Sequence, residues 1–338
     1  MRNLNKEVER KNWNRRTSHN LNRKDKRYNP HKADIKTSRV LGSEQIEAPI
    51  HLDLYNEENR ELTLKFIKLI EAKAYERKVS LDFSNSESVS AAALLLLYAT
   101  VDTLKQDPDA RLVRLQNLKG KVKSTVECSG LRDLTLNKGS QPINCKNRTL
   151  PIIKGSAKGE EFEVVIDHVQ HHVFDNEMTP EQENIWATAV IETVSNVKLH
   201  AYEGEESKPW WIICSIIGEE LYLAICDRGV GIPNTIKDQN WITSLVEKTP
   251  RLQKLLSGTD ADAIDLSMIV GETSTKAQKH GLGSKSIKAL VDENPDGALW
   301  VFSNKGVYYR ENQEAVLKNF GESISGTLVQ WNIKLNYE

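Results

Sequence analysis

The hydrophobic and polar positions in the first half of the chain switch repeatedly between strand-like and helical periods. Alternating or short apolar runs typical of strands fall at 50–54, 79–83 and 111–115. Each is followed by a run with helical spacing, at 62–72, 90–104 and about 120–128. This strand–helix order predicts an α/β fold in which helices cover a sheet of parallel strands.

The most informative helical pattern lies in the second half and ends in the sequence ETVSNVKLHAY at 192–202. Residues four apart lie one above another on a helix, so Glu192, Asn196 and His200 are predicted to form one polar stripe. The opposite side is apolar and is predicted to pack on a core; it consists of Ala189, Val190, Val194, Val197 and Ala201.

The start of this helix is also well marked. Thr179 suits the N-cap, Pro180 the first helical position, and Gln182 completes a capping box. Upstream, 163–166 (EVVI) has the composition of a short strand. Gly, Ser, Pro, Asn and Lys at 139–160 indicate a linker or domain edge.

Two apolar runs after the helix, 210–217 and 221–226, are separated by Gly-Glu-Glu and predict a buried hairpin. The second run leads into DRGVGIP at 227–233. An ionised Asp227 only accepts hydrogen bonds and suits an exocyclic amine such as that of adenine. Gly229 and Gly231 would let the backbone approach a ligand closely. An ordinary strand-to-helix turn with a capping aspartate remains the alternative interpretation.

A second glycine-rich stretch, GLGS at 281–284, precedes a helical pattern with Ile287, Leu290 and Val291 on one side. Unpaired N–H groups at a helix start favour phosphate, and nearby lysines, Lys279 among them, add positive charge. The spacing fits neither a Walker A loop nor a dinucleotide fingerprint. Near the end, Gly326-Thr327 leads into a strand-like run at 328–335.

Taken in this order, the four motifs resemble the four boxes of the GHKL ATP-binding superfamily over about residues 160–338. That group contains gyrase-type ATPases, heat-shock chaperones, histidine kinases and mismatch-repair ATPases. The first motif is most similar to the anti-sigma-factor serine kinase branch. The resemblance implies a Bergerat-type α/β sandwich with a mixed sheet at 151–338, and the cofactors ATP and Mg²⁺.

The resemblance also implies a role for each motif residue. Asn196 would coordinate Mg²⁺ through its amide oxygen, and Glu192 would be the general base. Asp227 would accept a hydrogen bond from the adenine amine, with Thr327 beneath the base. Gly229 and Gly231 would line the base and ribose, and the loop 273–283 would form a mobile lid over the phosphates. Further ATP-binding positions implied by that lid are Lys279, Gly281, Leu282, Gly283 and Ser284. His200 belongs either to the site or to a pairing within the fold.

The region from Asn234 to Val270 is a long insertion relative to this pattern. It contains apolar residues at helical spacing, among them Trp241, Leu245 and Leu255. It is interpreted as a helical lid or a partner surface, with additional packing as the alternative.

The first half carries a second resemblance. VSLDFSN at 79–85, followed by SVSAAALL at 88–95, resembles the STAS domain, the anti-sigma-factor-antagonist fold, and 115–132 is similar to its later strand and helix. The family's Asp-Ser-Ser-Gly phosphorylation loop is absent, and Ser86, Ser88 and Ser90 only approximate it. A STAS-like α/β domain at 41–150 therefore implies a structural or docking module for a protein partner.

The amino-acid composition is unusual mainly at the N-terminus. The 338-residue chain has a net charge of −1, but residues 1–40 hold 13 Lys and Arg against 4 Asp and Glu. Such a basic arm cannot fold alone. It is either a solvated tail or an arm for nucleic acid or another partner.

A membrane location and a zinc site are both disfavoured. The longest apolar run, 91–101, is too short for a bilayer, and no apolar signal region begins the chain. A cytoplasmic protein without membrane contact is expected. Its four cysteines lack the spacing of a zinc site. Whether the chain forms homo-oligomers is left open.

Three functions fit these observations. The favoured one is an ATPase or ATP-gated switch that controls a partner. The second is a protein serine kinase acting on a STAS-type partner. The third is a nucleotide-dependent, non-catalytic module that binds nucleic acid.

Overall fold

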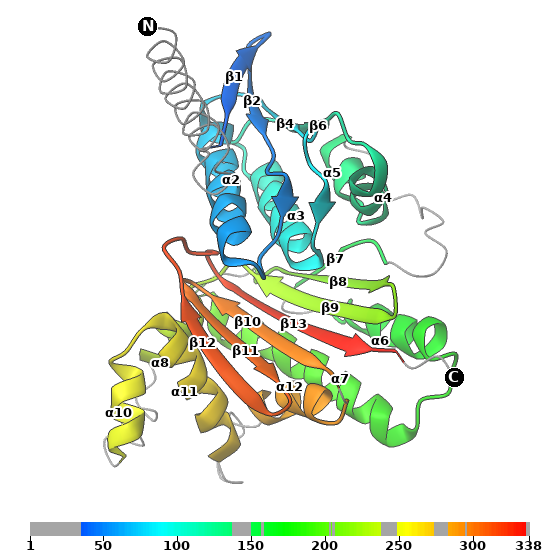
Figure 1. The fold of residues 1–338 in the computed structure, drawn as a ribbon, viewed down its shortest axis with the longest axis vertical. Coiled ribbons are helices and arrows are strands. Elements are labelled where there is room, and N and C mark those ends of the chain that lie inside the picture. Colours follow the sequence, from blue (N-terminus) through cyan, green and yellow to red (C-terminus); the bar gives the residue numbers. More distant parts are fainter. Residues whose placement is uncertain are drawn as a thin grey trace, which may run out of the picture.

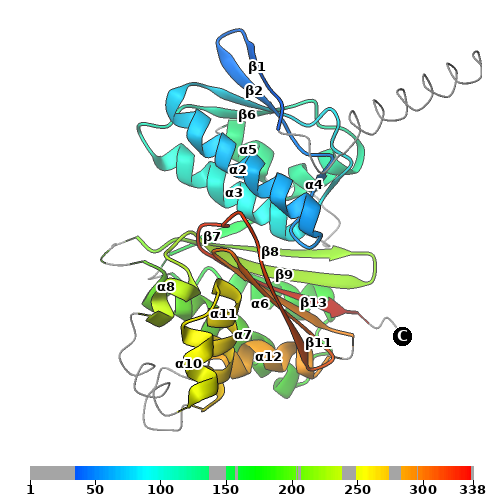
Figure 2. The same ribbon diagram turned by 60° about the vertical axis from the view of Figure 1, so that its left-hand side comes forward.

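The computed structural model describes residues 35–136, 150–156, 159–202, 204, 207–237, 249–273, 283–294 and 296–335. The protein is mixed α/β and contains a mixed sheet, as the sequence predicts. Figure 1 and Figure 2 show a smaller N-terminal half placed over a larger, sheet-based C-terminal half. Within the described residues, no helix combines the length and apolar character needed to cross a bilayer.

The N-terminal half contains the mixed sheet, which has both parallel and antiparallel strand pairs. Its elements are β1 (Thr37–Val40), β2 (Ser43–Glu47), β3 (His51–Leu52), α2 (Glu57–Glu76), β4 (Val79–Asp82), β5 (Ser88–Val89), α3 (Ala91–Gln106), β6 (Val113–Gln116), α4 (Gly120–Cys128) and α5 (Leu131–Leu136). The strand order is β1-β2-β4-β6, in which β2, β4 and β6 are parallel and β1 is antiparallel to β2. The predicted helices and the strands at 79–83 and 111–115 are therefore confirmed, with small shifts of their ends. The strand predicted at 50–54 is only the short β3, which pairs with β5.

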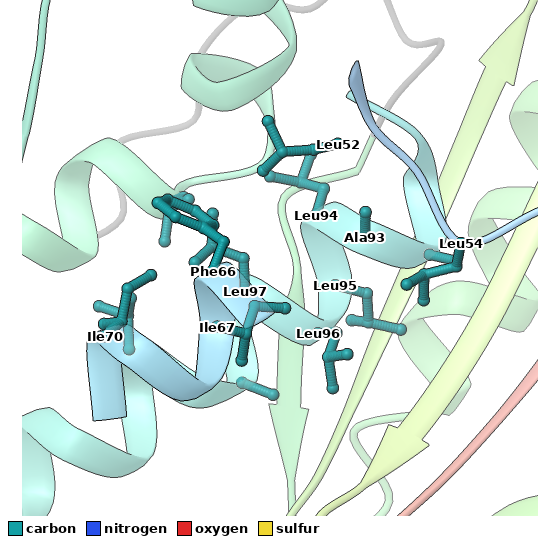
Figure 3. Packing of buried hydrophobic residues seen from close by; sticks show 14 of the residues in the cluster. Leu52, Leu54, Phe66, Ile67, Ile70, Ala93, Leu94, Leu95, Leu96 and Leu97 are labelled. Carbon is teal, nitrogen blue, oxygen red and sulfur yellow. The ribbon is translucent and has the colours of Figure 1, made fainter. Parts of the chain in front are cut away.

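The two long helices of this half begin at side-chain caps. Asn56 accepts hydrogen bonds from the N–H groups of Glu58 and Asn59 at the start of α2, and Ser90 accepts from Ala93 at the start of α3. Helix α3 is apolar on nearly every side, which is typical of a helix that is buried all round. Figure 3 shows its residues 93–97 packed with Phe66, Ile67 and Ile70 of α2.

The C-terminal half is built on a seven-stranded sheet. Its strands are β7 (Ile153–Gly155), β8 (Trp210–Ile217), β9 (Glu220–Asp227), β10 (Ala298–Ser303), β11 (Gly306–Glu311), β12 (Glu314–Asn319) and β13 (Thr327–Lys334). Its helices are α6 (Glu163–His168), η1 (Val169–Val173), α7 (Pro180–Asn196), η2 (Val197–Ala201), α8 (Ile232–Lys237), α10 (Pro250–Leu256), α11 (Asp260–Thr273) and α12 (Gly283–Asp292), where η1 and η2 are π-helical. The strand order is β12-β11-β10-β13-β9-β8-β7.

Several sequence expectations for this half are met and two are corrected. The hairpin β8–β9 and the strand β13 are confirmed, and α8, α10 and α11 provide the helices predicted around 234–270. Trp241 and Leu245 of that region lie outside the described residues. The expectation of a mixed sheet at 151–338 is wrong in detail, because all pairings of the seven strands are antiparallel. The strand predicted at 163–166 is wrong, because these residues begin helix α6.

Both faces of the seven-stranded sheet are covered. Side chains alternate along β13, so that Trp331 and Ile333 join a core shared with α7 and α12, while Leu328 faces the opposite way. On that second face, Leu328 and Trp211 belong to one continuous core with α2 and α3 of the N-terminal half. Helix α3 therefore lies between the two sheets, which explains why its sequence is so uniformly apolar.

Candidate functional site

Asp227 ends β9 and is the centre of the candidate site. Its side chain is buried, at 5% exposure, and its carboxylate accepts a hydrogen bond from the Gly229 N–H at 2.8 Å and another from the backbone N–H of Thr327. Burial raises the pKa of Asp227 to about 6, and the two N–H donors and Arg228 oppose that rise. A carboxylate has about four lone-pair sites. Asp227 therefore keeps acceptor capacity for a ligand donor.

The two predicted glycines are required by the packing of the loop after β9. A side chain at Gly229 would place its Cβ 1.9 Å from the carbonyl oxygen of Ala201, and the Val230 N–H donates to the same oxygen at 2.8 Å. Gly231 has a φ of +82°, and its Cβ would meet the side chain of Asn304. The loop 228–231 is thus pressed against the end of η2.

Thr327 lies beside Asp227 and is joined there by Ser303, which the sequence analysis did not single out. Ser303 pairs with Thr327 across β10 and β13, and their hydroxyl oxygens are 2.9 Å apart. The Ser303 hydroxyl also accepts the Ile232 N–H at 2.9 Å. The signal in the sequence is that Ser303 ends the apolar run at 298–303, and the structure shows that it is fully buried. Ser303 fixes both the start of β13 and the loop that follows Asp227.

Helix α7 carries two of the three residues of the predicted polar stripe, and the placement of His200 on that stripe is wrong. Its capping box is formed as predicted, and the five apolar residues of the opposite side are buried. Glu192 is half-buried and Asn196 is exposed. The α-helical spacing ends at Asn196, and His200 lies in the π-helical segment η2. Glu192 and Asn196 therefore form the stripe, and His200 is placed where the helix joins the loop after β9.

Ala201 and Tyr202, which follow α7 in the chain, form hydrogen bonds with the loop directly after Asp227. The Ala201 carbonyl accepts from Val230, and the Tyr202 hydroxyl accepts the Arg228 N–H at 2.9 Å while donating to the Pro209 carbonyl at 2.8 Å. The structure therefore brings Asp227, Gly229, Gly231 and Thr327 together at one end of the sheet. It also joins them to the helix that bears Glu192 and Asn196.

The second glycine motif is described only from its third residue. Gly283 begins α12, as predicted, whereas Lys279, Gly281 and Leu282 lie outside the described residues. Ser284 is buried and donates its hydroxyl to the Met268 carbonyl at 3.1 Å. Helix α12 packs on the sheet face that α7 also covers. The backbone N–H groups in the first turn of α12 are the groups of this helix that could bind an anion.

Asn196 could supply one oxygen ligand to a metal ion. Across the described part of the chain, no three His, Cys, Asp or Glu residues are grouped so that they could hold a metal ion. Asn196 offers one hard amide oxygen on an exposed helix position. Mg²⁺ in phosphate sites commonly keeps several waters and uses one or two protein ligands together with phosphate oxygens. Asn196 fits that role.

Ser86, Ser88 and Ser90 form hydrogen bonds within the N-terminal half. The Ser86 hydroxyl donates to the Pro49 carbonyl at 2.8 Å, Ser90 caps α3, and the Ser88 hydroxyl lies 2.9 Å from Nδ1 of His51. These bonds hold the β3–β5 pair and the start of α3.

Neither the scan against protein-family models nor the search of curated proteins found a match to the chain. The fold defines a mixed α/β protein with a buried acidic residue at the end of an antiparallel sheet.

Proposed function

We propose that this chain binds Mg-ATP at the end of β9 and β13 and uses it as a conformational switch to control a partner, with hydrolysis resetting the switch. The observation that carries the proposal is Asp227. It is a buried acceptor held between the N–H groups of Gly229 and Thr327. It is joined through residues 201 and 202 to the helix that bears Glu192 and Asn196.

In this proposal the adenine amine donates to the free acceptor positions of Asp227. The glycines at 229 and 231 let the loop pack closely on Ala201 and Asn304, where any Cβ would collide, and this packing holds the backbone beside Asp227 for the base. The phosphates extend toward the start of α12, whose N–H groups attract anions. Asn196 supplies an amide oxygen to the magnesium ion, which neutralises phosphate charge when it is bound.

Glu192 is the proposed general base. It lies one helical turn before Asn196, so both side chains leave the same face of α7. Glu192 would take a proton from water as the water oxygen bonds to the γ-phosphorus and the bond to the β-phosphate oxygen breaks, releasing ADP and phosphate. A serine hydroxyl in place of water would give the kinase alternative with the same residues.

Binding is tested by calorimetry with Mg²⁺ and a non-hydrolysable ATP analogue. Asp227→Asn and Gly229→Ala should each weaken binding by about tenfold or more, because one loses the charged acceptor and the other displaces the loop. Gly321→Ala is the matched control, since its Cβ would meet no atom within 4 Å. A wild-type chain that produces no heat, or an Asp227→Asn variant that binds normally, would refute the proposal.

Assays with labelled ATP then distinguish hydrolysis, protein phosphorylation and binding without chemistry. Glu192→Ala should retain binding and lose turnover, and Asn196→Ala should lose the magnesium-dependent part of the affinity. Free phosphate from the wild type indicates an ATPase, a labelled added protein indicates a kinase, and neither product with intact binding indicates a switch without chemistry.

A further inference from the structure

Arg228, directly after the candidate adenine acceptor, reaches out of the C-terminal half. Its guanidinium donates to the Thr100 hydroxyl on α3 at 2.7 Å and forms an ion pair with Glu71 on α2. The side chain is largely buried, at 15% exposure. An ion pair that is partly desolvated and also hydrogen-bonded holds its geometry far better than a surface pair.

The backbone of Arg228 is held from the other side. Its N–H donates to the Tyr202 hydroxyl, and a Cβ at Gly326 would lie 2.3 Å from the Asp227 carbonyl oxygen and 2.8 Å from the Arg228 Cα. The peptide between Asp227 and Arg228 therefore has little room to move. A shift of α2 or α3 would pull on the guanidinium and hence on the residue next to the carboxylate.

Arg228 also acts on Asp227 through its charge. The charged and titratable neighbours of Asp227 within the described residues are Arg228, Tyr202 and Cys226. Burial raises the pKa of the Tyr202 hydroxyl and of the Cys226 thiol, so both are neutral at pH 7. Arg228 is thus the cation that favours the ionised form of Asp227.

We propose that Arg228 is a positioning residue for nucleotide binding, and that Glu71 and Thr100 of the N-terminal half anchor it. This inference rests on the proposed function and deepens it: the N-terminal half acts on the nucleotide site through its contacts with Arg228. Coupling of this kind is reciprocal. A protein partner that draws α2 away from Arg228 lowers ATP affinity, and bound ATP resists that partner.

The test measures the affinity of the full-length chain for the Mg-bound ATP analogue. Glu71→Ala and Arg228→Gln should each weaken binding by about fivefold or more, whereas Glu71→Gln, whose amide oxygen can still accept from the guanidinium, should lose less affinity than Glu71→Ala. Lys68→Ala is the matched control. It removes another ion pair of α2 with the C-terminal half, to Glu322 at 2.6 Å, and should change affinity by less than about twofold.

The pH dependence of binding separates positioning from simple loss of structure. Arg228→Gln should move the lower pH limit of binding upward, because Asp227 loses its neighbouring cation, while Glu71→Ala should weaken binding without that upward shift. The inference is overturned if Glu71→Ala binds like Lys68→Ala, or if Glu71→Gln loses as much affinity as Glu71→Ala. Those results leave ATP binding itself intact, whereas a wild-type chain that binds no nucleotide overturns both proposals.

Discussion

At the scale of single residues, Asp227 has the most unusual environment of the site. Its carboxyl is buried between β9 and β13, and desolvation outweighs the N–H donors and Arg228, so its pKa is raised to about 6. In an unfolded chain an aspartate has a pKa of about 4. The folded protein therefore binds more protons at Asp227 than the unfolded chain does between about pH 4 and 6.

This difference predicts how stability changes with pH. As pH rises through that window, Asp227 should make the wild type less stable relative to Asp227→Asn, by roughly 3 kcal/mol at most. Denaturant unfolding of both proteins at several pH values measures the effect. His168, whose pKa burial lowers to about 4, titrates with the opposite sign but is present in both proteins. If the stability of the wild type relative to Asp227→Asn stays constant or increases as pH rises, the assignment is contradicted.

At the scale of elements, α7 shows how a local signal fixes a helix start. The Thr179 N–H donates to Oε1 of Gln182 at 2.9 Å, and the Gln182 N–H donates to the Thr179 hydroxyl at 3.3 Å. Both donors would otherwise be unpaired at the start of the helix. The capping box could be predicted because all its atoms belong to neighbouring residues.

Thr179→Ala should therefore destabilise the protein by about 1 kcal/mol, without changing the site chemistry. Thr188→Ala on the same helix is the matched control, since its hydroxyl has only a 3.5 Å contact with Asn184, and alanine favours a helix interior. Thermal unfolding compares the two variants. Equal melting temperatures for both would show that the capping box contributes nothing to stability.

Helix α6 shows where a local pattern fails. The residues EVVI at 163–166 are too short for their period to separate strand from helix. The structure buries Phe162, Val165 and Val169, which lie three and four positions apart, and leaves Val164 exposed at 53%. Helical spacing therefore becomes visible only when the neighbouring residues and the core they face are known.

At the scale of the whole molecule, the two halves share one core. Trp211 of β8 is buried in the cluster that contains α3, and its indole N–H donates to Asp102 of α3 at 3.0 Å. The same carboxylate forms an ion pair with Lys154 of β7 at 2.9 Å. The two halves are therefore expected to unfold together.

Trp211→Phe removes this hydrogen bond and should cost about 1–3 kcal/mol, because the buried Asp102 carboxylate loses one of its hydrogen-bond donors. Hydrogen exchange should accelerate in both β4 and β13. Tyr75→Phe is the control, because it removes an exposed bond to Asp107 within the N-terminal half alone. Faster exchange in only one half of the Trp211 variant would show that the halves unfold independently.

The sequence by itself determined the features that depend on neighbouring residues: the helices α2, α3, α4, α7 and α12, the hairpin β8–β9, the capping box, and the order of Asn196, Asp227 and Thr327 along the chain. Hydrophobic period, caps and glycines act over a few residues, so a single sequence contains them. Only the tertiary structure decided that α3 lies between two sheets, that Ser303 joins Thr327, and that Arg228 reaches Glu71 and Thr100. Those contacts join residues far apart in the chain, and no local pattern specifies which distant side chain will occupy the space beside another.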